Sequence, residues 1–206
     1  PPTGANCIVP DRDPPGPTAD AACNQTLRTD FDYLSYTVGL DYQATEDMFF
    51  YLKHSRAFRS GGFNPRNGTP PPNIPFDPEE VNDIEGGVKA DWLDSRLRTN
   101  LAIFYAEYTD VQRPGNTVGG AAGLLQPAQY EINAGDAHVS GLEIEVTAAP
   151  YTGLELTASL GLTDAKYDTF GDARLGDRSG EDFPQTPDMT WALGATQRLP
   201  VSFGEF

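Results

Sequence analysis

The sequence lacks any long hydrophobic run. Nowhere do about 18 apolar residues follow one another, so no segment could cross a bilayer as an α-helix. A membrane β-barrel needs only about 9 to 11 alternating residues per strand, so the mean hydropathy of −0.44 leaves that class open. Sustained helical periodicity is also missing, and Pro and Gly are frequent, which predicts little helix.

Basic residues are scarce. Lys and Arg together number 14 against 30 Asp and Glu, which gives a formal net charge of −16. Nucleic-acid binding requires clusters of Lys and Arg that neutralise phosphates, so nucleic acid is excluded as a partner. The acidic balance mainly favours solubility of the exposed surface.

Cysteine and histidine are nearly absent. The cysteines are Cys7 and Cys23, and the histidines are His54 and His138, too few for a metal site. A disulfide that closes a loop of about 15 residues contributes on the order of 3 kcal/mol and implies an oxidising compartment. We favour this pairing over a metal site or a reactive thiol, because no His lies nearby and no CxxC pair is present.

Catalytic motifs are missing as well. The sequence contains no GxSxG elbow, no HExxH and no P-loop, so no enzyme activity and no cofactor are expected. The sequons at Asn24 and Asn67 are interpreted as chance matches. The N-terminus lacks the features of a signal peptide, which for a surface protein suggests processing or truncation.

Strict alternation of apolar and polar residues is what the sequence does have. It is cleanest over 141–148 and 154–163, which the short turn 150–153 joins as a hairpin. We expect about eight antiparallel strands in all, the last incomplete. The further segments are 34–42, 48–56, 83–92, 97–108, 189–197 and 201–206.

The connections between these segments alternate in length. Short ones lie near 44–47, 93–96, 150–153 and 200, and long ones span 62–80, 112–130 and 170–186. Tight periplasmic turns and long extracellular loops are typical of outer-membrane barrels. Aromatic residues near the two ends suggest interfacial girdles: Tyr42, Phe49, Trp92 and Tyr151 at the short-turn end, and Phe58, Tyr108, Tyr167 and Phe170 at the long-loop end.

Two other classes remain open at this point: a small free-standing barrel, adhesive or enzymatic, and a secreted β-sandwich that binds carbohydrate. A sandwich would bury its aliphatic positions between two sheets, whereas a membrane wall would leave them exposed. The positions that discriminate are Leu154, Leu156, Leu160 and Leu162. The opposite face of a wall would carry a charged network, with Glu85, Lys89, Glu143 and Glu145.

Several ordered blocks resemble one family. Residues 55–64, SRAFRSGGFN, are similar to the S-[KR]-[GA]-F-[KR]-S-G-G-[FY]-N signature of TonB-dependent receptors. The block FDPEEV at 76–81 leads into IEGGVK at 84–89, and NLAIFYAEYTDVQ at 100–112 follows at the family's spacing. Residues 133–135, 141–145 and 185–187 match further, so the resemblance covers roughly residues 33–200.

The resemblance implies an all-β fold: an antiparallel meander of about eight long transmembrane strands, which is a segment of an outer-membrane β-barrel of about 22 strands. We expect residues 1–32 to be an extracellular loop with a disulfide and residues 33–206 to be a partial barrel. The plug domain and the remaining strands are expected to be absent.

The function that the resemblance implies is active import of a scarce ligand across the outer membrane of a Gram-negative bacterium. A ferric siderophore is the favoured ligand. The implied partners are outer-membrane lipid, that ligand, and the TonB–ExbB–ExbD complex acting through the missing plug.

The candidate ligand-binding residues lie at the rim and in the loops: Arg56, Arg59, Phe63, Asn64 and Arg66. Arg56 and Arg59 could instead pair with acids of the wall. Gly61 and Gly62 would let a strand bend as it leaves the barrel rim. The loop 119–126 is apolar for an exposed segment, and could be packed or ligand-facing.

Overall fold

The computed structural model describes residues 28–64, 75–119, 126–172, 176–201 and 204–205, and this part of the chain contains strands and no helix. Cys7, Cys23, Arg66, both sequons and residues 120–125 lie outside the described residues. No helix that is long and apolar enough to span a membrane occurs in the part described.

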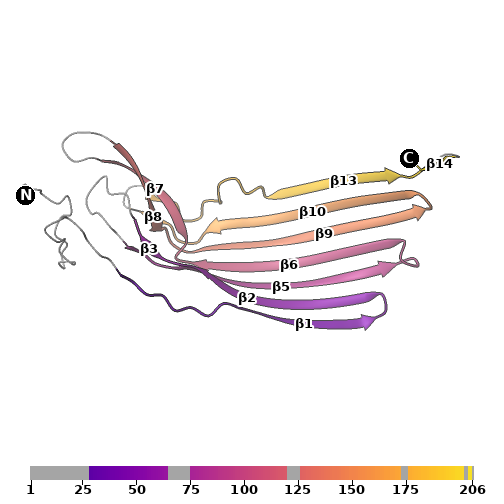
Figure 1. Ribbon diagram of the computed structural model, residues 1–206, viewed down its shortest axis with the longest axis horizontal. Helices are drawn as coiled ribbons and strands as arrows, with labels where there is room; N and C mark the ends of the chain where they lie inside the picture. Colours follow the sequence, from indigo (N-terminus) through magenta and orange to yellow (C-terminus); the bar gives the residue numbers. More distant parts are fainter. Residues whose placement is uncertain (1–27, 65–74, 120–125, 173–175, 202–203, 206) are drawn as a thin grey trace, which may run out of the picture.

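A single antiparallel sheet of seven long strands forms most of the molecule, in the order β1-β2-β5-β6-β9-β10-β13 (Figure 1). The strands are β1 (Tyr36–Thr45), β2 (Met48–Arg59), β5 (Glu79–Trp92), β6 (Leu97–Thr109), β9 (Ala137–Tyr151), β10 (Leu154–Tyr167) and β13 (Met189–Gln197). Each long strand pairs with its predecessor among these seven, so the sheet is a meander and the predicted fold is confirmed.

Four short two-stranded sheets accompany the main one: β3 (Gly62–Phe63) with β4 (Pro75–Phe76), β7 (Gln112–Gly119) with β8 (Gln126–Asn133), β11 (Gly171–Asp172) with β12 (Gly176–Asp177), and β14 (Pro200–Val201) with β15 (Gly204–Glu205). The prediction of an eighth strand of the main sheet over 201–206 was therefore wrong. The described residues there, 200–201 and 204–205, form a small hairpin and are not paired with the main sheet.

The two ends of the sheet differ as the connection lengths predicted. The turns β1–β2, β5–β6 and β9–β10 are short and share one end, whereas the long connections β2–β5, β6–β9 and β10–β13 share the other (Figure 1). The β7–β8 hairpin belongs to the β6–β9 connection and projects from the long-loop end. At the short-turn end Gly153 adopts φ +91°, a conformation that glycine tolerates without strain.

Residues opposite one another in an antiparallel register point to the same side, so the pairings divide the sheet into two faces. Leu101 lies opposite both Val88 and Ile144, and Leu160 opposite both Ile144 and Trp191. We call this side the apolar face. Its main members are Val38, Leu40, Leu52, Val88, Leu101, Ile103, Leu142, Ile144, Val146, Leu160, Leu162, Trp191 and Leu193.

The apolar face is uncovered. Leu40 and Leu193 are 68% and 75% exposed, and no second large sheet packs on it in the described part of the chain. Leu156 and Leu162 are exposed, and Leu154 and Leu160 are half-buried rather than enclosed. A β-sandwich would bury all four, so the fold is a wall and not a sandwich.

Aromatic residues on the apolar face only partly match the predicted girdles. Tyr42, Trp92 and Tyr151 lie on it at the short-turn end, but Phe49 is in register with Lys89 and points to the other side. At the long-loop end Phe58 lies on the apolar face and stacks on Tyr33 at 5.0 Å between ring centroids. Tyr108, Tyr167 and Phe170 pack inside a buried cluster, so their assignment to a girdle was wrong.

Candidate ligand-facing site at the base of the long connections

The side of the sheet opposite the apolar face carries charged and amide groups, and we call it the polar face. Lys53 Nζ lies 2.7 Å from a carboxylate oxygen of Glu85, to which the Tyr51 hydroxyl also donates at 2.8 Å. Asn100 donates to Glu145 at 3.1 Å. The predicted wall network is confirmed for Glu85 and Glu145, and Lys89 lies 5.9 Å from the centroid of the Tyr51 ring.

Two aromatic rings of the polar face lie flat over glycines of the next strand. A Cβ atom on Gly87 would collide with the ring of Tyr51, and one on Gly141 would collide with the ring of Phe104. Each position also faces a backbone oxygen, of Leu101 and Leu162 respectively. Glycine is therefore required where the ring covers the neighbouring strand.

Where β6, β8, β9 and β10 reach the long-loop end, the molecule has a small core. Val111, Ala134, Ala137, Tyr167 and Phe170 are buried together, and the partly buried Tyr108, Ile132 and Phe183 pack against them. We call this cluster the loop base. Arg113 covers it, since its Nε donates to the Tyr167 hydroxyl at 2.7 Å and its guanidinium lies 4.7 Å from the Phe183 ring centroid. Cation–π stacking of this kind favours Arg over Lys.

Gln112 joins three connections beside the loop base. Its side chain is fully buried, and its Nε2 lies within hydrogen-bond distance of the backbone oxygens of Arg59, Ser60 and Asp77. Its backbone N–H donates to Glu79 at 2.6 Å. Arg59 ends β2 and Glu79 begins β5. Gln112 alone therefore holds both the start and the end of the β2–β5 connection.

Two asparagines extend this arrangement. Asn64 exchanges two hydrogen bonds with the backbone of Glu131, at 2.9 and 2.6 Å, and so pairs with β8 as another strand would. Asn133 accepts from the backbone N–H of Asp77 at 2.7 Å and donates to the oxygens of Asp77 and Asp110. We call Asn64, Gln112 and Asn133 the amide staples. Asn64 and Gln112 are buried, and buried amides with these bonds made are costly to remove.

Glycines allow the backbones to approach at the same place. A Cβ on Gly61 would meet the backbone of Phe76, and one on Gly135, at φ +140°, would meet the backbone of Thr169. Gly62 then pairs with Phe76 in the β3–β4 ribbon. The expected bend at Gly61 and Gly62 is confirmed, because β2 ends at Arg59 and the chain departs into this ribbon.

Acidic groups gather around the turn after β6. Burial raises the pKa of Asp110, and the nearby carboxylates of Asp136, Asp77 and Glu80 raise it further. Asp110 also has φ +56°, in the left-handed region that Asp and Asn tolerate. Within the described residues, no group of three or more His, Cys, Asp or Glu side chains is placed to hold a metal ion.

The structure separates the predicted site residues. Arg59 is exposed on the polar face, in register with Glu79, and no carboxylate of the described residues lies within 4.0 Å of its guanidinium. Arg56 lies on the opposite side, in register with Asn82, and is held 2.5 Å from Glu80. Phe63 is half-buried in β3, and Asn64 is an amide staple rather than an exposed group.

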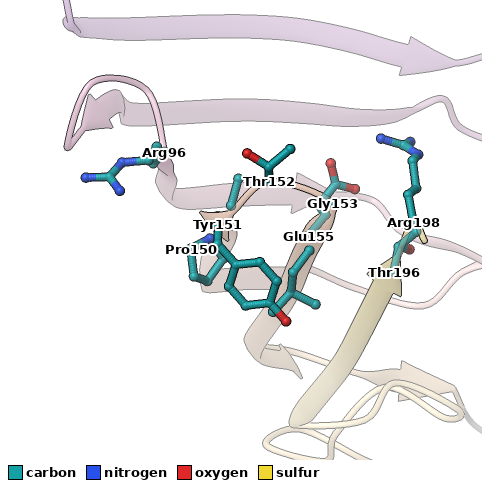
Figure 2. A pocket seen from close by; sticks show the side chains of 10 residues that line it. Arg96, Pro150, Tyr151, Thr152, Gly153, Glu155, Thr196 and Arg198 are labelled. Atoms are coloured by element: carbon teal, nitrogen blue, oxygen red, sulfur yellow. The ribbon is translucent and has the colours of Figure 1, made fainter. Parts of the chain in front are cut away.

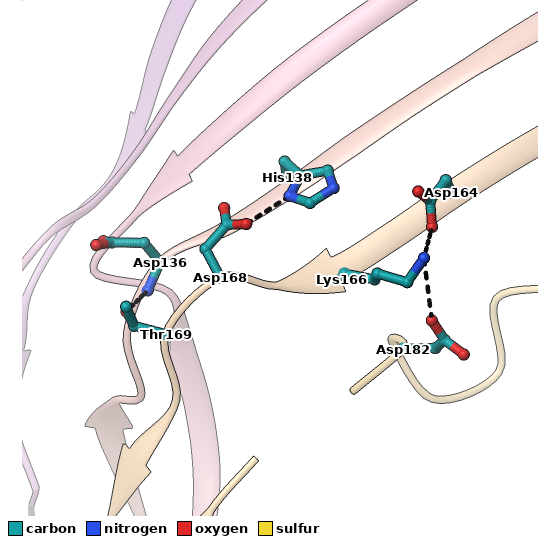
Figure 3. A network of polar contacts seen from close by, with 7 residues as sticks. All are labelled: Asp136, His138, Asp164, Lys166, Asp168, Thr169 and Asp182. Atoms are coloured by element: carbon teal, nitrogen blue, oxygen red, sulfur yellow. Dashed lines mark hydrogen bonds and ion pairs between the residues drawn. The ribbon is translucent and has the colours of Figure 1, made fainter. Parts of the chain in front are cut away.

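A second charged group lies on the outer side of the wall, at the long-loop end of the apolar face. His138 is 2.7 Å from Asp168, and Lys166 is 2.5 Å from Asp164 and 3.9 Å from Asp182 (Figure 3). His138 and Lys166 are opposite one another in the β9–β10 register, four pairs beyond Leu142 and Leu162 and on the same face. The apolar face therefore ends there and gives way to ion pairs.

Sequence reasoning missed the amide staples Gln112 and Asn133. Gln112 ends the 100–112 block and Asn133 begins the 133–135 block, but the family resemblance does not reveal that these amides bond to the backbone of other connections. The sequence feature that could have identified them is a polar side chain next to an apolar residue where strand alternation stops: Gln112 follows Val111, and Asn133 precedes Ala134.

Comparison with known proteins decides the family. The family model described as TonB dependent receptor-like, beta-barrel matches residues 11–204. The chain belongs to this family of TonB-dependent receptors. Its apolar face accordingly faces lipid in the outer membrane of a Gram-negative bacterium, and its polar face lines the barrel lumen.

Individual relatives agree with this assignment. The chain is 29% identical over 147 residues to the metal-pseudopaline receptor CntO of Pseudomonas aeruginosa, covering 71% of this chain and 18% of that protein. It is 23% identical to the probable TonB-dependent siderophore receptor PiuA of Acinetobacter baumannii, covering 87% and 24%. The chain thus spans about a fifth of the length of these receptors.

A solved structure shows the same fold. The ferric yersiniabactin uptake receptor FyuA of Yersinia pestis superposes with a TM-score of 0.62 at 18% identity, over 82% of this chain and 23% of that one. The meander is therefore the arrangement found in the wall of a complete receptor barrel. Within the described residues the sheet is not closed into a ring.

Proposed function

We propose that this chain forms part of the wall and extracellular loops of a receptor that imports a scarce metal chelate across the outer membrane. A ferric siderophore is the favoured ligand. The family match over residues 11–204 carries the proposal. The relatives support the ligand class, since they are receptors for metal-pseudopaline, for a siderophore and for ferric yersiniabactin.

The remaining parts of the transport system are part of the same proposal. A complete barrel of about 22 strands would enclose a plug, and TonB with ExbB and ExbD would act on that plug to release the ligand inward. The Cys7–Cys23 disulfide in the segment 1–32 also stays a prediction. An enzyme role has no support in the family, whose members are receptors and transporters.

Arg59 is the residue that we propose contacts an anionic chelate. It lies at the end of β2 on the lumen side, exposed, while Gln112 holds the backbone of Arg59 and Ser60 in place. An arginine fixed through its backbone but free at its guanidinium can bind a carboxylate or catecholate oxygen through two parallel hydrogen bonds. Phe63 and Arg66 would follow it into the loop.

The import function is tested by deleting the complete receptor gene and measuring uptake of radioactive iron supplied as hydroxamate, catecholate and carboxylate chelates. We expect loss of uptake for one chelate class, and loss of the same uptake when a protonophore removes the proton gradient. Unchanged uptake of every ferric chelate, with loss of a nickel, zinc or cobalt chelate, would replace iron as the cargo.

Arg59 has a matched control three residues away. Arg59→Gln should weaken binding of the transported chelate roughly tenfold, which corresponds to about 1.4 kcal/mol, whereas Arg56→Gln should leave binding unchanged because Arg56 is on the lipid side. Binding is measured by fluorescence quenching on the purified full-length receptor. Equal losses in both variants would contradict a specific role for Arg59.

A further inference from the structure

The loop base continues the polar face to the extracellular mouth of the wall. Tyr108 and Tyr167 are both in register with Ala137. Ala137 and Glu143 are separated by an even number of positions in the same regular strand, so all these side chains point to the lumen side. Arg113 packs on Tyr167, and its guanidinium therefore lies on the lumen side of the mouth.

The β7–β8 ribbon directs Arg113 away from its own acid. Arg113 is in register with Ile132, so both point to the side of the ribbon that packs on the loop base. Gln112 and Glu131 precede them in β7 and β8 and point to the other side, where Gln112 contacts the β2–β5 connection. The carboxylate of Glu131 is thus separated from the guanidinium by the ribbon itself.

Arg113 uses only one of its nitrogens as a donor within the described residues. Its Nε donates to the Tyr167 hydroxyl at 2.7 Å, and its guanidinium carbon lies 5.5 Å from the centroid of the Tyr167 ring and 4.7 Å from that of Phe183. In the same part of the chain, Nη1 and Nη2 have no hydrogen-bond acceptor and no ion pair. Because Arg113 is only half-buried, these two nitrogens are available to a ligand.

Arg98 shows how an arginine of the polar face is used when its role is structural. It makes two hydrogen bonds to Asp91, at 2.7 and 2.9 Å. Arg113 has lost part of its hydration without gaining such a partner. The Tyr167 hydroxyl and the Phe183 ring instead fix the plane of its guanidinium, and a fixed guanidinium edge matches the two parallel oxygens of a planar anion.

Two other arginines also lack an ion pair in the described residues. Arg96 and Arg198 line a surface pocket of about 360 Å³ at the short-turn end, on either side of the β9–β10 turn (Figure 2). Both are exposed, and no ring of the described residues stacks on either guanidinium. They also lie at the periplasmic end, away from the mouth. Arg113 is therefore the better placed of these cations to meet a ligand that arrives from outside.

We propose that Arg113 binds a planar pair of anionic oxygens on the cargo, from a carboxylate or a catecholate, and so selects negatively charged chelates over neutral hydroxamates. Tyr167 is a positioning residue that orients the guanidinium through Nε. Gln112, which precedes Arg113, bonds to the backbone of Arg59, so both arginines can meet one chelate. The inference rests on the proposed import function in one respect, that a metal chelate enters at this mouth.

The test is equilibrium dialysis of the purified full-length receptor against radioactive ferric tris(catecholate), ferric citrate and neutral ferric tris(acetohydroxamate). We expect at least one anionic complex to bind roughly tenfold more tightly than the neutral complex. Arg113→Gln should remove that preference and leave the affinity for the neutral complex unchanged. The complex that loses affinity identifies the source of the oxygens, a carboxylate or a catecholate.

Two further variants separate ligand binding from a structural role. Arg113→Lys keeps the charge but loses the flat edge and the Nε bond, so it should restore only part of the preference. Tyr167→Phe keeps the ring and removes the hydroxyl, and should weaken binding of the anionic complex roughly threefold. If Arg113 only held the loop base together, each variant would lower the affinities for all three complexes in proportion.

Arg178→Gln is the matched control, because it removes the same charge from an exposed residue of the β10–β13 connection. It should leave the three affinities unchanged, and an equal loss there would reduce the effect to net charge. The inference is overturned if neither anionic complex binds at concentrations on the order of 1 mM, if all three bind equally, or if Arg113→Gln weakens the neutral complex as much.

The dialysis experiment and the uptake experiment can fail separately. Uptake of iron from hydroxamate chelates alone would support import and overturn the selectivity inferred for Arg113. Loss of a nickel, zinc or cobalt chelate in place of iron would change the proposed cargo, while the preference for anionic complexes and its dependence on Arg113 would still be measured by dialysis.

Discussion

The wall and the loop base are built in different ways from one chain. The wall has long strands, exposed leucines on one face and a polar network on the other, and its buried side chains away from the loop base are few and small, such as Ala90. The loop base buries aromatic rings, and it is bordered by the fully buried amide of Gln112. The wall therefore depends on the surrounding lipid for its apolar contacts, whereas the loop base supplies its own.

The largest expected effect comes from placing a charge on the lipid side of the wall. Ile144 lies opposite Leu101 and Leu160, within the apolar face. Ile144→Arg should lower the free energy of unfolding by about 2 to 4 kcal/mol, the cost of a basic residue near the middle of a bilayer. Reversible urea unfolding of the full-length receptor in lipid vesicles measures this change.

The control for that variant is the next residue. Glu143→Arg introduces the same side chain on the lumen side, beside Ala102 and Gly161, where water is present. We expect a change below about 1 kcal/mol. A loss as large as that of Ile144→Arg would mean that the two faces are not divided between lipid and lumen.

The second effect concerns the loop base. Gln112→Ala removes the donor to the backbone oxygens of Arg59, Ser60 and Asp77, which should lower the free energy of opening the loop base by about 2 kcal/mol. We expect only the β2–β5 connection to open more often. Hydrogen exchange should therefore become faster at residues 59–64 and 76–80, while the amides of β9 and β10 keep their protection.

Gln197→Ala is a suitable comparison, since Gln197 lies at the short-turn end and is exposed. It should leave exchange at the long-loop end unchanged. Equal acceleration throughout the sheet in Gln112→Ala would show that the wall and the loop base unfold as one unit.

The smallest effect is pH-dependent. Because burial and neighbouring carboxylates raise the pKa of Asp110, its ionised form destabilises the folded loops at neutral pH. Asp110→Asn keeps the tolerated φ of +56° and removes that charge. The variant should be slightly more protected at pH 7, and the gain should disappear as the pH falls below the usual range of an Asp carboxyl.

Hydrogen exchange of residues 108–112 at pH 7 and near pH 4 gives the comparison. A gain that is the same at both pH values would point to an effect of the amide itself. A gain that grows as the pH falls would contradict the direction of the pKa shift.

The sequence predicts the wall well because successive residues of a strand point to opposite faces, so every second residue has the same environment. Leu142, Ile144 and Val146 alternate with Gly141, Glu143 and Glu145, and the register places each group on one face. The lengths of the connections likewise predict which end holds the loops. The strand expected over 201–206 was a weak signal because its alternation is short, and its described residues pair in a small hairpin apart from the sheet.

The loop base could not be predicted in this way. Tyr108, Tyr167 and Phe170 were expected at a lipid interface, because aromatic residues near strand ends often lie there. Their burial depends on Val111, Ala134 and Phe183, which come from other connections. Arg56 and Arg59 occupy one signature, yet opposite faces, and only the register of β2 against β5 distinguishes them.

The glycine positions beneath Tyr51 and Phe104 have a consequence for the width of the passage. An aromatic side chain that stands upright on the inner wall would narrow the lumen. These two rings instead lie along the wall, because Gly87 and Gly141 leave them room. Replacing either glycine by a residue with a side chain would push a ring toward the barrel axis, so Gly87 and Gly141 help to set the width of the lumen.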